Sequence, residues 1–239
     1  MDPQDKKQMK VLFIASWYPN REHAVDGIFI KRHAIAVSKY CDVAVLNVHL
    51  GTIEDGIDVS KDKGILEVTV YRKLNNYQNK LMINLSQVVQ YLEYFLGALR
   101  GYDVIEKEFG KPDLVHCNVI IYAGIFSFYL KMIYNIRYII TEHWTGYLAK
   151  SGIFNNSSIF RKNLTRVIGK RAIAITTVSG SLRDAMIKCG IDNDYFVIPN
   201  VAQMDDCNCY KTQEDSKQIL HVSLLKDDIK NVSGILSAI

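Results

Sequence analysis

Short apolar runs rich in β-branched residues recur along the chain, and stretches with helical spacing separate most of them. The runs are KVLFIAS (10–16), DVAVLNVH (42–49), ILEVTVYR (65–72), DLVHCN (113–118), RYIITEH (137–143), AIAITTVS (172–179) and YFVIP (195–199). Strands that are apolar at successive positions are typical of parallel sheets, because helices cover both faces of such sheets. We therefore predict a strand at each run.

The stretches between the runs favour helices. Along 81–99, apolar side chains recur at three- and four-residue spacing and share one helix face: Leu81, Leu85, Val88, Leu92, Phe95 and Leu99. Further helices are predicted at 28–40, 119–135, 155–170 and 180–189, the last with Ser179 as N-cap and Gly190 as C-cap. Strands that alternate with helices predict an α/β fold, with a Rossmann-like doubly wound parallel sheet over about residues 9–200.

The pattern changes after VIPN. Residues 201–218 are polar and predict a linker, ILHVS (219–223) predicts a new strand, and NVSGILSAI (231–239) predicts the first turns of a helix. One strand and part of a helix cannot bury a core of their own. We therefore expect a fragment of a longer protein that holds only the start of a second Rossmann-like domain. The alternative is a tail that docks on the first domain.

Composition narrows the classes of partner. The chain has 239 residues, of which 49% are apolar, and a net charge of +4. This weak positive charge does not indicate a nucleic-acid partner, but it suits anionic small molecules or an anionic membrane surface. The N-terminus lacks the apolar segment of a secretory signal, and the longest apolar stretch, 119–130, is shorter than the roughly 20 residues of a spanning helix.

The cysteines indicate a reducing compartment. There are five, an odd number, which is typical of reduced thiols in a cytoplasmic protein. A single residue separates Cys207 from Cys209, but without a second pair of cysteines they do not predict a metal site.

Candidate chemistry lies where the strands end. Ligands of open α/β sheets bind beyond the carboxyl ends of the strands, near the point where the strand order switches. This rule selects the residues directly after the runs: 16–27, 116–118, 142–146 and 179–181. Glu142, His143 and Trp144 lie together at one such end. For His143 the alternative is a histidine that is satisfied by a backbone carbonyl.

The first loop, SWYPNREHAVDG (16–27), lacks the G-x-G-x-x-G fingerprint that a dinucleotide-binding fold carries after its first strand. We therefore expect no NAD or FAD cofactor. Only Gly27 is present, at the start of the predicted helix 28–40. It fits either an anion that approaches the helix N-terminus or a simple turn.

The helix 155–170 is basic. Lys162, Arg166 and Lys170 follow one another at four-residue spacing, and Arg161 and Arg171 lie beside them. Such a stripe fits lipid phosphates or an anionic substrate, and it equally fits a solvated helix face.

These motifs together resemble the N-terminal half of a GT-B-fold glycosyltransferase of the family 4 type, as used in bacterial polysaccharide and glycoconjugate synthesis. The resemblance covers nearly all of residues 9–239 and is carried by KVLFIASWYP, DGIFIKRHAIAVSK, PDLVHCNVIIYAG, IITEHWTGY, ITTVSGSLRDAMIKCG and FVIPN, in this order. It implies two Rossmann-like domains around a cleft, with the acceptor on the N-terminal domain and the nucleotide-sugar donor on the C-terminal domain. It also implies glycosyl transfer with retention of configuration and without a bound metal.

The resemblance assigns roles to particular residues. Asp26 and Gly27 match a glycine loop near the donor phosphates and acceptor, and His143 matches a histidine close to the reacting sugar, our candidate catalytic residue. His116 matches the first histidine of His-x-His, whereas Asn118 stands in place of the second, which keeps hydrogen bonding but loses a titratable group. We assign these two, with Glu142 and Trp144, to substrate binding; Trp144 fits either a sugar face or the filling of the hinge side.

The tail departs from the family pattern. Leu224 stands where an arginine that grips the diphosphate is expected, and Lys230 can serve for the following lysine. We therefore expect a chain that is inactive alone, the acceptor half of a transferase whose acceptor is a glycan or a lipid-linked glycan. One alternative is a non-catalytic glycan- or lipid-binding relic. The other is a nucleotide-dependent oxidoreductase, which the missing glycine fingerprint disfavours.

Overall fold

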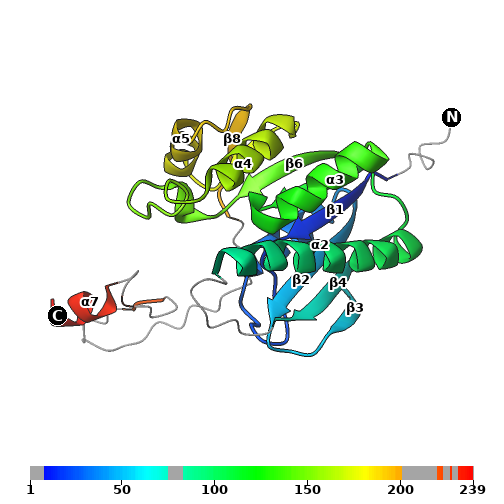
Figure 1. Ribbon diagram of the computed structural model, residues 1–239. Coiled ribbons are helices and arrows are strands. Elements are labelled where there is room, and N and C mark those ends of the chain that lie inside the picture. Colours follow the sequence, from blue (N-terminus) through cyan, green and yellow to red (C-terminus); the bar gives the residue numbers. More distant parts are fainter. Residues whose placement is uncertain (1–7, 75–82, 201–219, 223–226, 228–230, 239) are drawn as a thin grey trace. The chain divides into compact units, whose positions relative to one another are not determined.

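The computed structural model describes residues 8–74, 83–200, 220–222, 227 and 231–238. Two compact units divide between Gln203 and Met204. The first unit carries the sheet (Figure 1). In the second unit, the helix α7 (Val232–Ser237) agrees with the helix predicted at 231–239. Residues 220–222 have no regular secondary structure, and the predicted linker at 201–218 lies outside the described residues.

One eight-stranded sheet forms the first unit, in the order β3-β4-β2-β1-β5-β6-β7-β8. The strands are β1 (Lys10–Ala15), β2 (Asp42–Gly51), β3 (Gly56–Asp62), β4 (Ile65–Lys73), β5 (Leu114–Asn118), β6 (Arg137–Glu142), β7 (Ile175–Thr177) and β8 (Tyr195–Val197). Neighbouring strands are parallel except β3, which pairs antiparallel with β4. The predicted doubly wound sheet is therefore confirmed, and the edge strand β3 is added to it.

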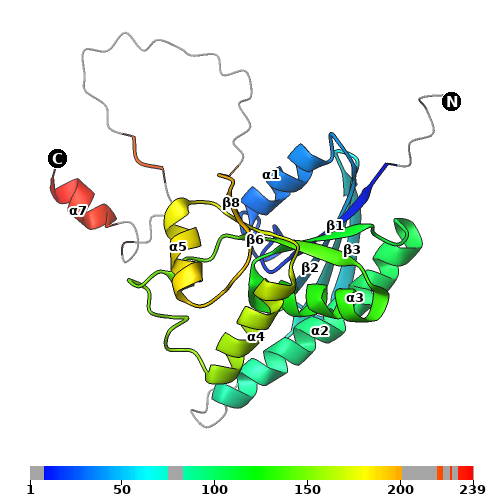
Figure 2. The same ribbon diagram turned by 90° about the horizontal axis from the view of Figure 1, so that it is seen from above.

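Helices cover both faces of the sheet (Figure 2). They are α1 (Ile28–Val37), α2 (Ile83–Glu108), α3 (Ile125–Tyr134), α4 (Ile159–Arg171) and α5 (Gly180–Lys188). The helix α1 lies on one face and α2 and α3 lie on the other. The sheet has one hydrophobic core on each face. Alternate residues of β1 pack in one core or the other, because successive side chains of a strand point to opposite faces. Phe13 packs in the core under α1, and Leu12 and Ile14 pack in the core under α2 and α3.

The long helix α2 buries a different face from the one that its aliphatic residues predict. Val88 and Leu92 are more than half exposed, whereas Tyr94 and Tyr102 are buried. Gly97 also faces the sheet, since a Cβ there would lie 2.7 Å from a methyl carbon of Val48. Small residues of α2 face β2 and β4, while the Tyr94 hydroxyl reaches β1 and the Tyr102 ring packs on α3. Val88 and Leu92 of the predicted stripe are left outside, whereas Phe95 and Leu99 are partly buried against the core.

The segment after β5 is not the continuous helix predicted at 119–135. Val119 and Tyr122 have φ values of 70° and 62°, in the left-handed region that side chains disfavour. The turn η2 (Ile120–Gly124) therefore separates β5 from α3, which begins at Ile125. This irregular turn lies at the carboxyl edge of the sheet, where ligands are expected.

Candidate functional site

Two cavities lie at the carboxyl edge of the sheet, next to the switch in strand order between β1 and β5. The first, here the His143 cavity, has a volume of about 320 Å³ and is lined by Trp17, Asp26, Gly27, Phe29, His143, Trp144 and Thr145. The second, here the Asn47 cavity, measures about 350 Å³ and is formed by the loop after β1, the end of β2, α2 and the turn η2. Trp17 and Asp26 line both. The structure thus brings four predicted site residues into one cavity: Asp26, Gly27, His143 and Trp144.

Gly27 begins α1 and cannot be replaced without strain. Its φ of 60° is left-handed, and a Cβ would lie 2.3 Å from the carbonyl oxygen of Trp17. Its own carbonyl accepts the first helical hydrogen bond, from Ile30 N at 2.8 Å. The backbone of the first loop therefore passes directly over the start of α1. A helix start carries partial positive charge, which favours an anionic or polar ligand at this wall of the cavity.

His143 presents an unpaired imidazole to its cavity. Neither ring nitrogen has a hydrogen-bond partner within the described part of the chain, so no backbone carbonyl there satisfies this histidine. The ring packs against Phe29 at 4.4 Å and edge-on to His33 at 5.9 Å. Burial, with a smaller contribution from His33, lowers the pKa of His143 to about 4; the Asn200 side chain opposes the shift but makes no contact of hydrogen-bond geometry. At neutral pH the ring is uncharged, with one donor and one acceptor available.

His116 and Asn118 lie beneath this surface and line neither cavity. His116 Nε2 and Thr141 Oγ1 are 2.6 Å apart, and the ring packs 4.3 Å from Phe13. Burial, followed by the charges of His33 and His143, lowers the pKa of His116 to about 3. Asn118 is fully buried and donates from Nδ2 to the His116 carbonyl at 3.0 Å. Their predicted contact with substrate stays a prediction, because the structure shows only that they support the strand ends.

Glu142 is fully buried, and both its oxygens are used inside the protein. Oε1 accepts from the backbone N–H groups of His143 and Trp144 at 2.9 and 2.8 Å, and Oε2 accepts from Ile120 N at 3.1 Å. The Tyr147 hydroxyl adds a longer contact of 3.4 Å. Burial raises the pKa of Glu142 to about 7, against the lowering effect of these donors. The carboxyl group thus ties the turn after β5 to the turn after β6, behind the cavity wall.

The indole of Trp144 occupies the space that the missing side chain of Gly146 leaves open. A Cβ on Gly146 would lie 2.0 Å from the Trp144 ring, so the glycine leaves the space that the indole fills. The indole also packs edge-on to Tyr147, and the guanidinium of Arg161 lies over it at 5.3 Å. The ring is therefore held in place at the rim of the His143 cavity.

The basic helix is partly occupied by internal contacts. Arg166 Nε donates to the Cys189 carbonyl at 2.9 Å, and Lys162 Nζ donates to the Asn155 carbonyl at 2.6 Å. Arg161 lies at the first turn of α4, where the Ser158 hydroxyl caps the helix by accepting from Arg161 N at 3.2 Å. None of these cations lines the two cavities.

Sequence reasoning missed several residues of the two cavities. Phe29 lies beside His143 in the first cavity, and Asn47 and His49 in the second half of β2 line the other. Asn47 carried a signal, since it interrupts the apolar run DVAVLNVH near its carboxyl end. The predicted donor-phosphate residue Lys230, together with Leu224, Cys207 and Cys209, lies outside the described residues.

Among the described residues, no group of three or more His, Cys, Asp or Glu side chains is placed to hold a metal ion. No helix in that part of the chain has the length and apolar character needed to cross a membrane.

Comparisons with known proteins identify the family. A family model described as Glycosyltransferase Family 4 matches residues 75–205, more than half of the 239 residues. No curated protein is significantly similar to the chain.

Solved structures resemble the chain at low sequence identity, and the first of them shows its fold. Sucrose-phosphate synthase from Thermosynechococcus elongatus superposes with a TM-score of 0.55 and 12% identity, over 80% of this chain and 48% of that one. The catalytic domain of starch synthase IV from Arabidopsis thaliana, bound to ADP and acarbose, gives a TM-score of 0.49 and 11% identity, over 81% of this chain and 51% of that one. The chain thus spans about half the length of these proteins. The fold is the Rossmann-like domain of GT-B enzymes, and the chain belongs to glycosyltransferase family 4.

Proposed function

We propose that the chain forms the acceptor side of a retaining glycosyltransferase, which moves a sugar from a nucleotide-sugar donor to a glycan or lipid-linked acceptor in cell-surface polysaccharide synthesis. Family membership supports the reaction class. The main evidence for the site is the neutral imidazole of His143, whose ring nitrogens lack a hydrogen-bond partner among the described residues, in a cavity at the switch point of the sheet. In this proposal no metal or resident cofactor takes part, and the nucleotide sugar is a substrate.

The chemistry of transfer suits such a site. The transition state resembles an oxocarbenium ion with a departing diphosphate, so it needs fixed hydrogen-bond donors and positive potential more than a strong base. His143, with its pKa lowered to about 4, is a poor base at neutral pH but a good hydrogen-bonding group for a sugar hydroxyl or phosphate. The start of α1 at Gly27 adds positive potential. Asp26 and Trp144 complete the wall, the first for a hydroxyl and the second for an apolar sugar face.

We further propose that these residues alone do not turn over substrate. The described residues that line the two cavities include no lysine or arginine, so they provide no cationic side chain to bind a diphosphate. Calorimetry of the 239-residue chain with uridine and adenosine diphosphate sugars tests this. We expect affinities weaker than about millimolar. Micromolar binding would contradict the proposal that these residues form the acceptor side and do not bind the donor by themselves.

The transferase proposal is tested on the natural gene product at its full length, by release of nucleoside diphosphate from a panel of nucleotide sugars and glycan acceptors. His143→Gln retains a side-chain donor and acceptor but moves them, and we expect transfer to slow by about 100-fold or more. Arg137→Gln serves as the control, because Arg137 is exposed at the first position of β6, at the opposite end of this strand from the site, and lines neither cavity. Transfer at the wild-type rate in His143→Gln would remove this residue from the mechanism.

The same assay separates the alternative of a non-catalytic relic. If glycans bind the 239-residue chain but the full-length product releases no nucleotide with any donor, the protein is a glycan-binding module. Binding of NAD instead of nucleotide sugars would point to the oxidoreductase alternative.

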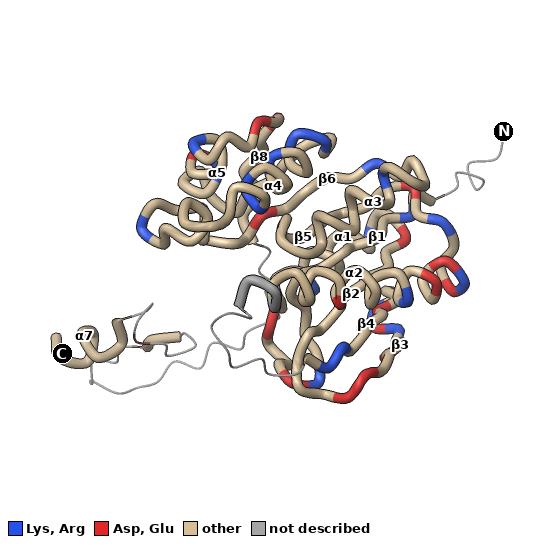
Figure 3. The backbone as a smooth tube through the Cα atoms, in the orientation of Figure 1, with Lys and Arg blue, Asp and Glu red and all other residues tan. Residues whose placement is uncertain are grey.

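A second candidate function is attachment to the cytoplasmic face of a membrane. Ile159 and Phe160, at the start of α4, are 76% and 75% exposed, and Arg161 and Lys162 follow them directly. Lys and Arg recur along this helix (Figure 3). Exposed apolar side chains beside cations are typical of surfaces that dip into the headgroups of anionic lipids.

Sedimentation with phosphatidylcholine vesicles, with and without phosphatidylglycerol, tests this attachment. We expect binding to the anionic vesicles only, weakened several-fold by Phe160→Asp and by added salt. Tyr40→Asp is the matched control, because Tyr40 is 84% exposed and follows α1, a helix on the face of the sheet opposite to α4 (Figure 2). Equal loss in both variants would mean that net charge, and not this surface, controls binding.

A further inference from the structure

The Asn47 cavity contains a buried polar group that the protein itself does not satisfy. Asn47 is only 2% exposed, and its Nδ2 has no hydrogen-bond partner among the described residues. A buried donor without a partner is costly, and native proteins retain few of them. Asn47 lies near the end of β2, in register with Ala15 of β1, and it lines the cavity. A ligand that accepts a hydrogen bond in this cavity would supply the missing partner.

An aromatic wall faces the same space. Tyr94 and Tyr122 both line the cavity, and their rings stack at 5.4 Å with an angle of 28°. Each is fixed by its hydroxyl: Tyr94 donates to the Ala15 carbonyl at 3.1 Å, and Tyr122 donates to Gln90 Oε1 at 2.9 Å. Tyr122 reaches this position from a left-handed backbone conformation, with φ of 62°. Strain of this kind persists where the surroundings enforce it, and it is concentrated at functional sites.

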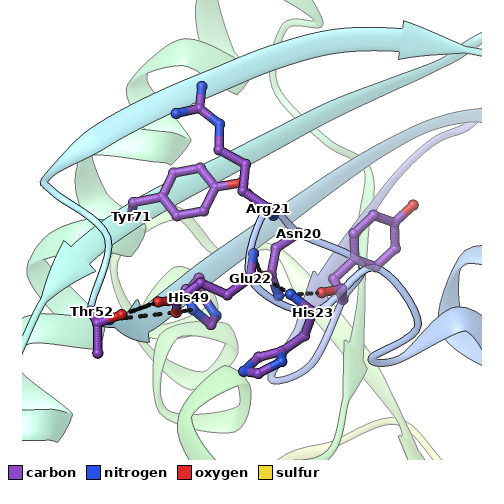
Figure 4. A network of polar contacts seen from close by, with 8 residues as sticks. Asn20, Arg21, Glu22, His23, His49, Thr52 and Tyr71 are labelled. Atoms are coloured by element: carbon purple, nitrogen blue, oxygen red, sulfur yellow. Dashed lines mark hydrogen bonds and ion pairs between the residues drawn. The ribbon is translucent and has the colours of Figure 1, made fainter.

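The charges around the cavity argue against an anionic ligand. Its lining, as far as the structure describes it, contains the carboxylate Asp26 and no lysine or arginine. Glu22 lies behind the rim and contacts His49 and the Thr52 hydroxyl (Figure 4). Hydrogen bonds from Thr52 and His49 lower the pKa of Glu22 to about 2, so it is anionic at neutral pH. The nearby cation Arg21 is paired with Asp58 and does not line the cavity.

We infer that the Asn47 cavity recognises an uncharged sugar ring of the acceptor, and that Asn47 is a specificity-determining residue that donates to one of its hydroxyl oxygens. The inference rests on the proposed transferase function and adds the class of acceptor. The half-buried Tyr122 ring, backed by the buried Tyr94, offers an apolar surface to the C–H face of the sugar ring, and the Asn47 amide fixes its orientation. Trp17 and Asp26 line both cavities, so an acceptor ring in the Asn47 cavity would lie next to the reacting sugar in the His143 cavity.

The test uses titration calorimetry and saturation-transfer NMR on the 239-residue chain. The probes are methyl glycosides of neutral hexoses, hexose phosphates and inorganic phosphate. We expect at least one neutral glycoside to bind about tenfold or more tightly than its phosphate. Asn47→Leu should weaken that binding by about tenfold, equivalent to about 1.4 kcal/mol. Its melting temperature should stay equal or rise, because an unpaired buried donor is removed.

Thr69→Val is the matched control. Thr69 is the register partner of Asn47 on β4 and is also buried, but it does not line this cavity. Its substitution should leave glycoside binding unchanged. Tighter binding of hexose phosphates, no binding of any neutral glycoside, or unchanged affinity in Asn47→Leu would each overturn the inference. A fall in melting temperature of Asn47→Leu with unchanged affinity would assign Asn47 a structural role.

Transfer kinetics of the full-length product separate this inference from the function on which it rests. We expect Asn47→Leu to raise the KM for the acceptor about tenfold and to leave the KM for the donor unchanged. If His143→Gln abolishes transfer and Asn47→Leu has no effect on either KM, the transferase proposal stands and the Asn47 inference fails. If the wild-type product transfers no sugar with any donor, the proposed function fails first.

Discussion

Replacement of Glu142 by glutamine isolates the ionisation of one buried carboxyl group. Desolvation favours the protonated form, whereas the three backbone N–H groups at 2.8–3.1 Å favour the ionised form. The pKa is raised from its ordinary 4.5 to about 7, so desolvation is the larger effect. Glutamine keeps an acceptor for His143 N and Trp144 N but does not titrate. The variant therefore serves as a reference without this ionisation.

The sign and size of the effect follow from linkage. A group whose pKa is raised on folding contributes stability that is fully present below its unfolded pKa and is lost as pH rises through its folded pKa. At about 1.4 kcal/mol per pH unit, the span from 4.5 to about 7 corresponds to about 3 kcal/mol. We expect the free energy of unfolding of the wild type, minus that of Glu142→Gln, to fall by about 3 kcal/mol between pH 4.5 and about pH 8.

Urea unfolding followed by circular dichroism, at several pH values in this range, measures that difference. His116 and His143 titrate in both proteins, so their contributions cancel. Tyr147→Phe is the control: it removes the longest contact of Glu142 and should keep the pH dependence of the wild type. A difference that is constant with pH would show that Glu142 titrates equally in both states. A difference that grows with pH would show that the N–H donors outweigh desolvation.

Three further substitutions test the framework of the site, each by urea unfolding. Gly27→Ala should lose about 3 kcal/mol, from a left-handed backbone and overlap with the Trp17 carbonyl; a loss below about 1 kcal/mol would mean that the first loop moves away easily. Ser158→Ala should lose about 1 kcal/mol, because Arg161 N loses its cap; no change would mean that water replaces the hydroxyl. Phe126→Ala, at a fully buried position under α2, should lose about 4 kcal/mol; a loss near that of Ser158→Ala would contradict close packing there.

Secondary structure that depends on local pattern could be predicted from the sequence. The apolar runs give the seven parallel strands of the sheet to within a few residues. Most of these strands are buried on both faces and must be apolar throughout, whereas the edge strand β8 is apolar although it is largely exposed. The edge strand β3 was missed, since it is exposed and its sequence GIDVSKD is polar. Its signal was the pair Lys63-Gly64, whose φ values of 49° and 80° form a tight hairpin turn.

The sequence also predicted where the candidate site should lie, because parallel strands bring all their carboxyl ends to one edge. That argument placed Asp26, Gly27, His143 and Trp144 there, and the structure brings these residues into one cavity. It could not separate lining residues from supporting ones. Glu142 follows the same strand as His143, yet it is fully buried with its oxygens bound to backbone. Which of two neighbouring residues points into a cavity depends on the loop conformation.

Only the tertiary structure identified the Asn47 cavity. Asn47, Tyr94 and Tyr122 lie far apart in the sequence and meet because β2, α2 and the turn after β5 converge at the sheet edge. On α2, Tyr94 and Tyr102 are buried, whereas Val88 and Leu92, which were expected to be buried, are exposed. Local pattern fixes which segments are strands and helices, because it reflects the burial of each segment by itself. The partners of a buried amide or carboxyl group are set by contacts between distant segments, and those exist only in the folded chain.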